Sequence, residues 1–291
     1  MTLNIPMESL KKVLMNAALG FLIVVLLIYI YYPTLAVLVS DWSTNPDYSH
    51  GFIIPFITLY MVWDVRKELA CDRIEQSFWG FGFLFMGVAL QVVAKVGSEH
   101  FLTGVSMIIV LWGLILYLGG AHIAKLLAVP VAYLFFMIPL PSIIWNKFSL
   151  VLKLYATEIS VFLIKLTGHI ALMQEGNIIH LSNGTLEVAD ACSGLRSLIS
   201  MLAIGVLIAV ISRYSLWKRW ALVVSAIPIA IIANIIRLVI LVFIADRYGF
   251  GVAEGFLHTF SGLLVFAIGV AMLSGVHVLF SHDFVHRHAP E

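Results

Sequence analysis

Residues 218–241 read KRWALVVSAIPIAIIANIIRLVIL, two basic residues followed by a run whose side chains are nearly all apolar. A run of about 20 apolar residues is long enough to cross the hydrocarbon core of a bilayer as a helix. The whole chain has this character, since 62% of its 291 residues are hydrophobic and 11% are charged. Soluble domains carry roughly 25% charged residues. One water-soluble core cannot bury so much apolar surface, so the sequence predicts an all-α polytopic membrane protein.

Eight segments are candidates for membrane spans: 13–32, 51–63, 78–95, 103–120, 122–139, 192–211, 218–241 and 259–280. Segment 142–166 differs, because four charged residues interrupt it while its apolar residues recur at helical spacing. This pattern predicts an amphipathic helix lying at the membrane interface, or alternatively a further tilted span. We expect residues 1–291 to form a single integral membrane domain.

The basic residues orient this bundle. Lys and Arg in short loops mark the cytoplasmic side of a membrane protein. With eight spans and both termini inside, the basic groups at 11–12, 66–73, 125, 213–219 and 287 all fall on the cytoplasmic side. The outer face then receives segments 33–50, 96–102, 140–191 and 242–258. The formal net charge is +1 and no long Lys/Arg run occurs, so we expect the partner to be the lipid bilayer and not nucleic acid.

A short hairpin is predicted just before the second cysteine. Two alternating apolar runs, NIIHL at 177–181 and TLEVA at 185–189, flank the dipeptide Asn183-Gly184. This dipeptide is typical of a type I′ turn, which needs positive φ at both central positions. The sequence therefore predicts a small extracytoplasmic β-hairpin that leads directly into Cys192.

Cys192 stands between charged neighbours at the outer end of a predicted span. Asp190 is a candidate N-cap, which would place Cys192 in the first helical turn, where the helix dipole stabilises a thiolate. Arg196 is four residues further on and shares the face of Cys192. A buried cysteine can alternatively be a small hydrophobic residue. The predicted topology puts Cys71 on the opposite face, so we expect no disulfide and no catalytic role for Cys71.

Two further polar groups fall near the same outer face. Asn234 and Arg237 are three residues apart in one span, and His258 lies at the mouth of the next. Charged residues inside a membrane usually face a bundle interior or a watery cavity, although Arg237 could also snorkel to the interface and Asn234 could join helices. A thiol, an imidazole and a guanidinium together can carry out acyl transfer.

A second outer patch precedes the second span, in DYSHGF at 47–52. Asp47, Tyr48 and His50 are candidates for substrate contact. Two metal-ligating side chains in one loop are weak evidence for a metal, so we expect no metal and no cofactor.

Several stretches of the chain together resemble the exosortases, relatives of the archaeosortases. They are DYSHGFIIPFITLYMVW at 47–63, MIPLP at 137–141, EGNIIHLSNGTLEVADACSGLRSL at 175–198, AIPIAIIANIIRLVIL at 226–241 and GFLHTFSGLLVF at 255–266. They appear in family order and cover most of the chain. The combination of ACSGLRS, NIIR and a histidine before the last span is specific.

The resemblance implies a cysteine protease-transpeptidase of the bacterial inner membrane, with its active site on the extracytoplasmic face. Its catalytic residues map onto Cys192, Arg237 and His258, and the motif positions around them are Asp190, Ser193, Gly194, Arg196 and Asn234. The implied substrates are exported proteins with a C-terminal tail made of a Pro-Glu-Pro-like signal, a transmembrane helix and a basic cluster. Such enzymes are often linked with exopolysaccharide. We expect no additional soluble C-terminal domain, and the acceptor molecule is not determined by the sequence.

Two other function classes remain open at this level. A transporter could use Asn234 and Arg237 as a pathway, although the polar groups gather at one face and no internal repeat is visible. A scaffold in exopolysaccharide export would carry a non-catalytic Cys192.

Overall fold

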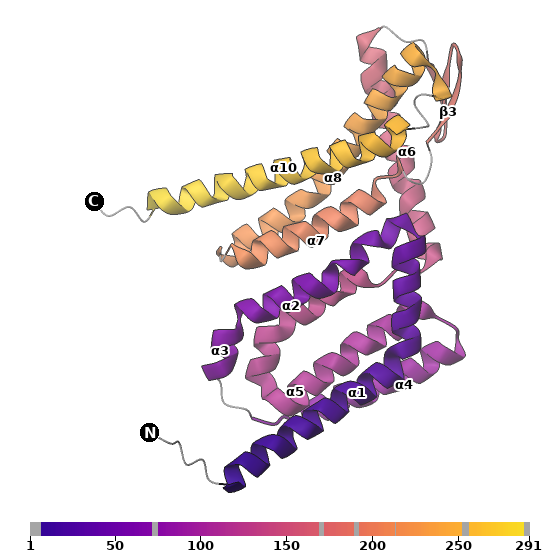
Figure 1. Ribbon diagram of the computed structural model, residues 1–291. Helices are drawn as coiled ribbons and strands as arrows, with labels where there is room; N and C mark the ends of the chain where they lie inside the picture. Colours follow the sequence, from indigo (N-terminus) through magenta and orange to yellow (C-terminus); the bar gives the residue numbers. More distant parts are fainter. Residues whose placement is uncertain are drawn as a thin grey trace. The chain divides into compact units, whose positions relative to one another are not determined.

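The computed structural model describes residues 7–71, 75–168, 172–188, 192–212, 214–251 and 256–287, without the side chains of 7–21, 71, 256–259 and 282–287. The described chain is mostly helical with one small sheet (Figure 1). It divides into two compact units, Met1–Pro139 and Leu140–Glu291.

The first unit is built only of helices over its described residues. They are α1 (Met7–Thr44), the 3₁₀ helix η1 (Pro46–Phe52), α2 (Ile54–Asp64), α3 (Arg66–Cys71), α4 (Trp79–Val96), α5 (His100–Tyr133) and the 3₁₀ helix η2 (Leu134–Met137). Helix α1 continues well past residue 32, where the first span was expected to end, so the predicted outer segment 33–50 is largely helical.

Helix α5 reverses direction at Gly120, whose φ of 86° and ψ of 179° are not helical. Gly104 near the start of α5 consequently lies beside Ile138, just after its end, and a Cβ on Gly104 would stand 2.9 Å from Ile138 Cγ2. The two predicted spans 103–120 and 122–139 thus correspond to the two antiparallel arms of α5. Helix α4 packs against α5 through glycines, since a Cβ on Gly80 would overlap the backbone of Tyr117.

The second unit begins with α6 (Ser142–Thr167), whose bounds match the predicted amphipathic segment. A three-stranded sheet follows, and then α7 (Leu195–Ile211), α8 (Leu216–Tyr248) and α10 (Phe256–Arg287), which pack side by side (Figure 1). At one end of these three helices the Tyr214 hydroxyl donates to the His277 carbonyl at 2.9 Å, and Lys218 Nζ donates to the Phe280 carbonyl at 3.0 Å. The sheet packs near the other end of α8.

The sheet contains the predicted hairpin and one strand more. Strands β1 (Leu172–Glu175), β2 (Ile178–Leu181) and β3 (Gly184–Glu187) are antiparallel in the order β1-β2-β3. The expected turn is wrong by one residue: Leu181 pairs with Gly184, so the two turn residues are Ser182 and Asn183. Gly184 instead opens β3 with a φ of 151°, where a Cβ would stand 2.5 Å from the Phe250 ring. Gly184 thus serves the close approach of the Phe250 ring to the strand, and not the turn itself.

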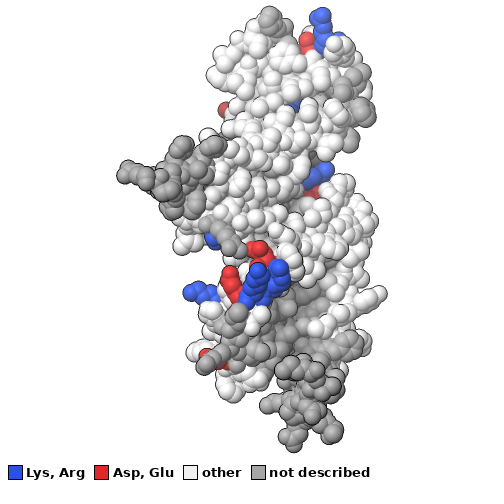
Figure 2. All heavy atoms as spheres, turned by 60° about the vertical axis from the view of Figure 1, so that its left-hand side comes forward, with Lys and Arg blue, Asp and Glu red and all other residues white. Residues whose placement is uncertain are grey.

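The prediction of eight spans is supported in part. Five described helices are long and apolar enough to cross a membrane: Leu22–Thr44, Trp79–Val96, His100–Met137, Leu216–Tyr248 and Phe260–Ser281. The third of these contains the reversal at Gly120 and holds two predicted spans. The other two predicted spans correspond to α2, with 11 residues, and α7, with 17, which are shorter than the usual 20. On the face seen in Figure 2, the described charged side chains form a few small groups between broad uncharged areas, as expected of a surface that faces lipid.

Candidate active site

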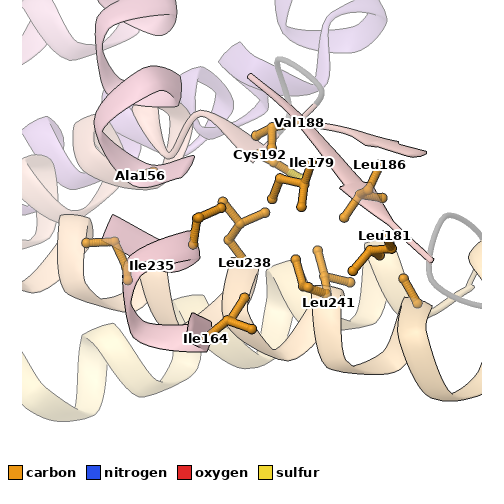
Figure 3. Packing of buried hydrophobic residues seen from close by; sticks show 13 residues of the cluster. Ala156, Ile164, Ile179, Leu181, Leu186, Val188, Cys192, Ile235, Leu238 and Leu241 are labelled. Atoms are coloured by element: carbon orange, nitrogen blue, oxygen red, sulfur yellow. The ribbon is translucent and has the colours of Figure 1, made fainter. Parts of the chain in front are cut away.

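Cys192 lies at the edge of the hydrophobic core that joins the sheet to α8. The inner face of the sheet contributes Ile179, Leu181, Leu186 and Val188, which pack on Leu238, Leu241 and Val242 of α8 (Figure 3). Cys192 belongs to the same cluster and is only 5% exposed. The sheet therefore does more than lead into Cys192, because it covers the part of α8 that follows Arg237.

Cys192 does not stand in the first turn of α7, where it was expected. Helix α7 begins at Leu195 with Gly194 as its N-cap, and Cys192 itself has 3₁₀-helical conformation, followed by a bend at Ser193 and Gly194. Gly194 adopts a φ of 82°, a left-handed conformation that ends the bend and starts the helix. Asp190, the expected N-cap, lies outside the described residues.

Asn234 of α8 holds this bend in place. Its Nδ2 donates to the Cys192 carbonyl at 2.8 Å, and Asn234 is itself 4% exposed. A Cβ on Gly194 would stand 2.9 Å from Asn234 Cγ, so the amide packs flat against the glycine. Asn234 can therefore support the site by holding the backbone of Cys192 in place.

Arg237 is buried one turn further along α8, at 8% exposure. Its Nε donates to Ser261 Oγ of α10 at 3.2 Å, and a Cβ on Gly262 would lie 3.5 Å from Nη2 and 3.6 Å from Cζ. The guanidinium is therefore seated on α10 and does not snorkel away from the bundle. Sequence reasoning missed Ser261; its spacing of three residues from His258 was the available signal, because such residues share a helix face.

Burial and charge act in opposite directions on the thiol. Burial raises the pKa of Cys192 above its ordinary value, while the positive charges of Arg237 and then Arg196 lower it, and the net direction is upward. The effect of Arg196 has the direction expected from the sequence, but burial of the thiol outweighs it. Because the thiolate is the nucleophilic form of cysteine, a reaction at this sulfur is favoured by a base that takes the thiol proton.

A small cavity lies beside the bend at Ser193 and Gly194. It offers about 10 Å³, roughly the space of one water molecule, and is lined by the polar residues Ser193 and Asn234 together with Gly194 and apolar side chains of α6, α7 and α8. Ser193 is 4% exposed, and its Oγ accepts from the Leu195 amide at 3.3 Å. Ser193 therefore stabilises the start of α7.

His258 lies in α10 three residues before Ser261, and its side chain falls outside the described residues. The structure therefore brings Cys192, Arg196, Asn234 and Arg237 together and describes no contact of the histidine.

The predicted second outer patch, residues 47–52, belongs to the first unit, and His50 has a backbone partner there. His50 Nε2 lies 3.2 Å from the Phe136 carbonyl oxygen, and Trp42 Nε1 donates to the next carbonyl, that of Met137, at 2.9 Å. Asp47 is the second residue of η1, and its amide donates to Asn45 Oδ1. His50 thus helps to hold η2 against η1, beside any contact with substrate. No group of three potential metal ligands occurs among the side chains that the structure describes.

Comparison with known proteins assigns the family. The model of the transmembrane exosortase family matches residues 42–275, which include both the second outer patch at 47–52 and the surroundings of Cys192. No match was found among curated proteins or among solved structures. The chain belongs to the transmembrane exosortase family, and this membership implies a membrane cysteine transpeptidase that sorts PEP-CTERM proteins.

Proposed function

We propose that Cys192 is the nucleophile of a protease-transpeptidase that cleaves exported proteins within a C-terminal sorting tail. The observation that carries this proposal is the buried Arg237 of α8, whose positive charge lowers the pKa of the Cys192 thiol against the effect of burial. A charged side chain within an apolar helix costs on the order of 2.5–3.5 kcal/mol, so such residues mark functional sites. An inert structural cysteine would have no need of this arrangement.

The chemistry divides into two acyl transfers. Cys192 Sγ attacks the carbonyl carbon of the scissile peptide bond while His258 takes the thiol proton. Arg237 stabilises the negative charge that develops on the carbonyl oxygen. The tetrahedral intermediate collapses to a thioester, and the leaving amine of the tail takes a proton from His258. An acceptor amine, or water, then attacks the thioester and regenerates the thiol.

The length of α8 supports an extracytoplasmic site. From Lys218 to Arg237 the helix rises about 28 Å, close to the roughly 30 Å thickness of the hydrocarbon core. If Lys218 and Arg219 mark the cytoplasmic interface of an inner-membrane protein, Arg237 lies at the opposite interface. A substrate whose own basic cluster stays inside would present its signal at the depth of Cys192.

Cleavage of a tailed substrate tests the proposal. A reporter protein with a Pro-Glu-Pro signal, a transmembrane helix and a basic cluster is co-expressed with the chain. We expect a shorter product with the wild type and none with Cys192→Ala, Arg237→Ala or His258→Ala. Arg247→Ala is the matched control, because Arg247 is exposed near the end of the same helix.

The variants must stay folded for this result to count, which thermal unfolding in detergent checks. Normal cleavage by folded Cys192→Ala would contradict the proposal and favour a scaffold or transporter. Normal cleavage by Arg237→Ala alone would remove only the role assigned to the arginine.

A further inference from the structure

We propose that Ser261 is a positioning residue, which fixes the guanidinium of Arg237 so that its terminal nitrogens act on Cys192. This inference deepens the proposed function and rests on it for its catalytic meaning. The effect of the Ser261 hydroxyl on the reactivity of the Cys192 thiol, exerted through Arg237, can be measured without a substrate.

The hydrogen bond between the two residues is buried and joins two helices. Ser261 Oγ of α10 accepts from Arg237 Nε of α8 at 3.2 Å, and each residue is 8% exposed. A guanidinium carries five N–H donors in a planar fork, of which Nε–H is the single one along the side chain. Binding at Nε fixes the rotation of the plane and leaves Nη1 and Nη2 at the far edge of the fork.

Gly262, the next residue of α10, lies beside the outer part of the guanidinium. A Cβ at this position would lie 3.5 Å from Nη2, 3.6 Å from Cζ and 3.8 Å from Nη1, which is ordinary van der Waals contact. Gly262 therefore leaves space beside the guanidinium and does not clamp it. The hydrogen bond from Nε to Ser261 is the contact of α10 that fixes where the positive charge of Arg237 lies.

The position of this charge matters because Arg237 is the stronger of two cationic influences on the thiol. It favours the thiolate more than Arg196 does, and both act against the effect of burial. Coulomb energy falls with distance, and the fall is steepest in a medium of low dielectric constant. A guanidinium released from Ser261 would rotate among several rotamers and spend less time near the sulfur.

The test measures the reactivity of Cys192 as a function of pH in the purified full-length protein. Iodoacetamide is the probe, because it is small and neutral, and mass spectrometry follows the peptide that contains Cys192. The peptide with Cys71 gives an internal reference in every sample. The variants are Ser261→Ala, Ser261→Thr, which keeps the hydroxyl, and Arg237→Gln. Ser274→Ala is the control, since the Ser274 hydroxyl bonds only within α10 in the described contacts, to the Val270 carbonyl at 2.8 Å.

We expect Ser261→Ala to raise the midpoint of alkylation by about 0.5 pH units, a roughly threefold lower thiolate fraction at a pH below the midpoint. Arg237→Gln should raise it further, Ser261→Thr should restore most of the wild-type profile, and Ser274→Ala should leave it unchanged. Thermal unfolding in detergent shows whether each variant is folded.

Two results would overturn the inference. One is a wild-type profile for folded Ser261→Ala beside a shifted profile for Arg237→Gln. The other is an equal shift for Ser261→Ala and Ser261→Thr, which would trace the effect to packing and not to the hydroxyl. Failure of the wild type to cleave any tailed substrate would count against the proposed function and would leave the measured profile, and hence this inference, standing.

Discussion

Single residues around Cys192 set its reactivity through two opposing effects, burial and positive charge. Because burial prevails, the pKa of the thiol is raised and the protonated form is favoured at neutral pH. We predict that alkylation of Cys192 by iodoacetamide in the absence of substrate has its midpoint above about 8.5, the ordinary cysteine pKa. The rate should therefore keep rising with pH beyond the range in which an exposed thiol has reached its plateau. A midpoint at or below the ordinary value would mean that the arginines dominate.

Gly194 is a second decisive residue, because both its backbone and its surroundings exclude a side chain. Its φ is 82°, and a Cβ would stand 2.9 Å from Asn234 Cγ. We predict that Gly194→Ala lowers the free energy of unfolding by about 1–3 kcal/mol, through strain and displacement of Asn234. Thermal unfolding in detergent measures this.

The matched control for this substitution is Gly275→Ala in α10. A Cβ there meets nothing within 4 Å, and alanine favours a helix over glycine by about 1 kcal/mol. We expect this variant to be neutral or slightly more stable. Equal stability of the two variants would show that the bend at Cys192 tolerates a side chain.

At the scale of elements, the reversal in α5 depends on Gly120. The φ of 86° is unfavourable for any other residue, and a Cβ would overlap the Glu75 carbonyl oxygen at 1.9 Å. We predict that Gly120→Ala strongly reduces the yield of folded protein, because the second arm of α5 could not return along the first. Gly82→Ala in α4 should have little effect, since a Cβ there meets nothing within 4 Å. Size-exclusion chromatography in detergent compares the two, and comparable yields would argue against a reversal at this residue.

The sheet is the other element on which the site depends. Asn183 Nδ2 at its turn donates to the carbonyls of Ala245 and Asp246, both at 3.2 Å, at the end of α8. Together with the apolar contacts of β2 and β3, these bonds fix the strand that leads toward Cys192. The sheet is thus part of the support of the site as well as a connection to it.

At the scale of the whole molecule, the orientation in the membrane can be measured at two exposed serines of the second unit. Ser182 lies in the turn between β2 and β3, and Ser215 lies between α7 and α8. We predict that a membrane-impermeant maleimide labels Ser182→Cys in intact cells and labels Ser215→Cys only after permeabilisation. Both substitutions are made in a Cys71→Ser, Cys192→Ser background. The reverse pattern would place Cys192 on the cytoplasmic side.

The sequence by itself determined the class of the protein, most of its helices and the identity of its chemical groups. Apolar runs of membrane length, the charge-interrupted segment 142–166 and the motifs around Cys192 and Arg237 are local properties, so they can be read without a structure. The additional strand β1, the shift of the turn away from Asn183-Gly184 and the late start of α7 at Leu195 could not be read in this way. Only the tertiary structure shows them, because they depend on contacts between segments distant in the chain, such as Gly184 with the Phe250 ring and Gly194 with the Asn234 amide. Their contacts outweigh local preferences of about 1 kcal/mol.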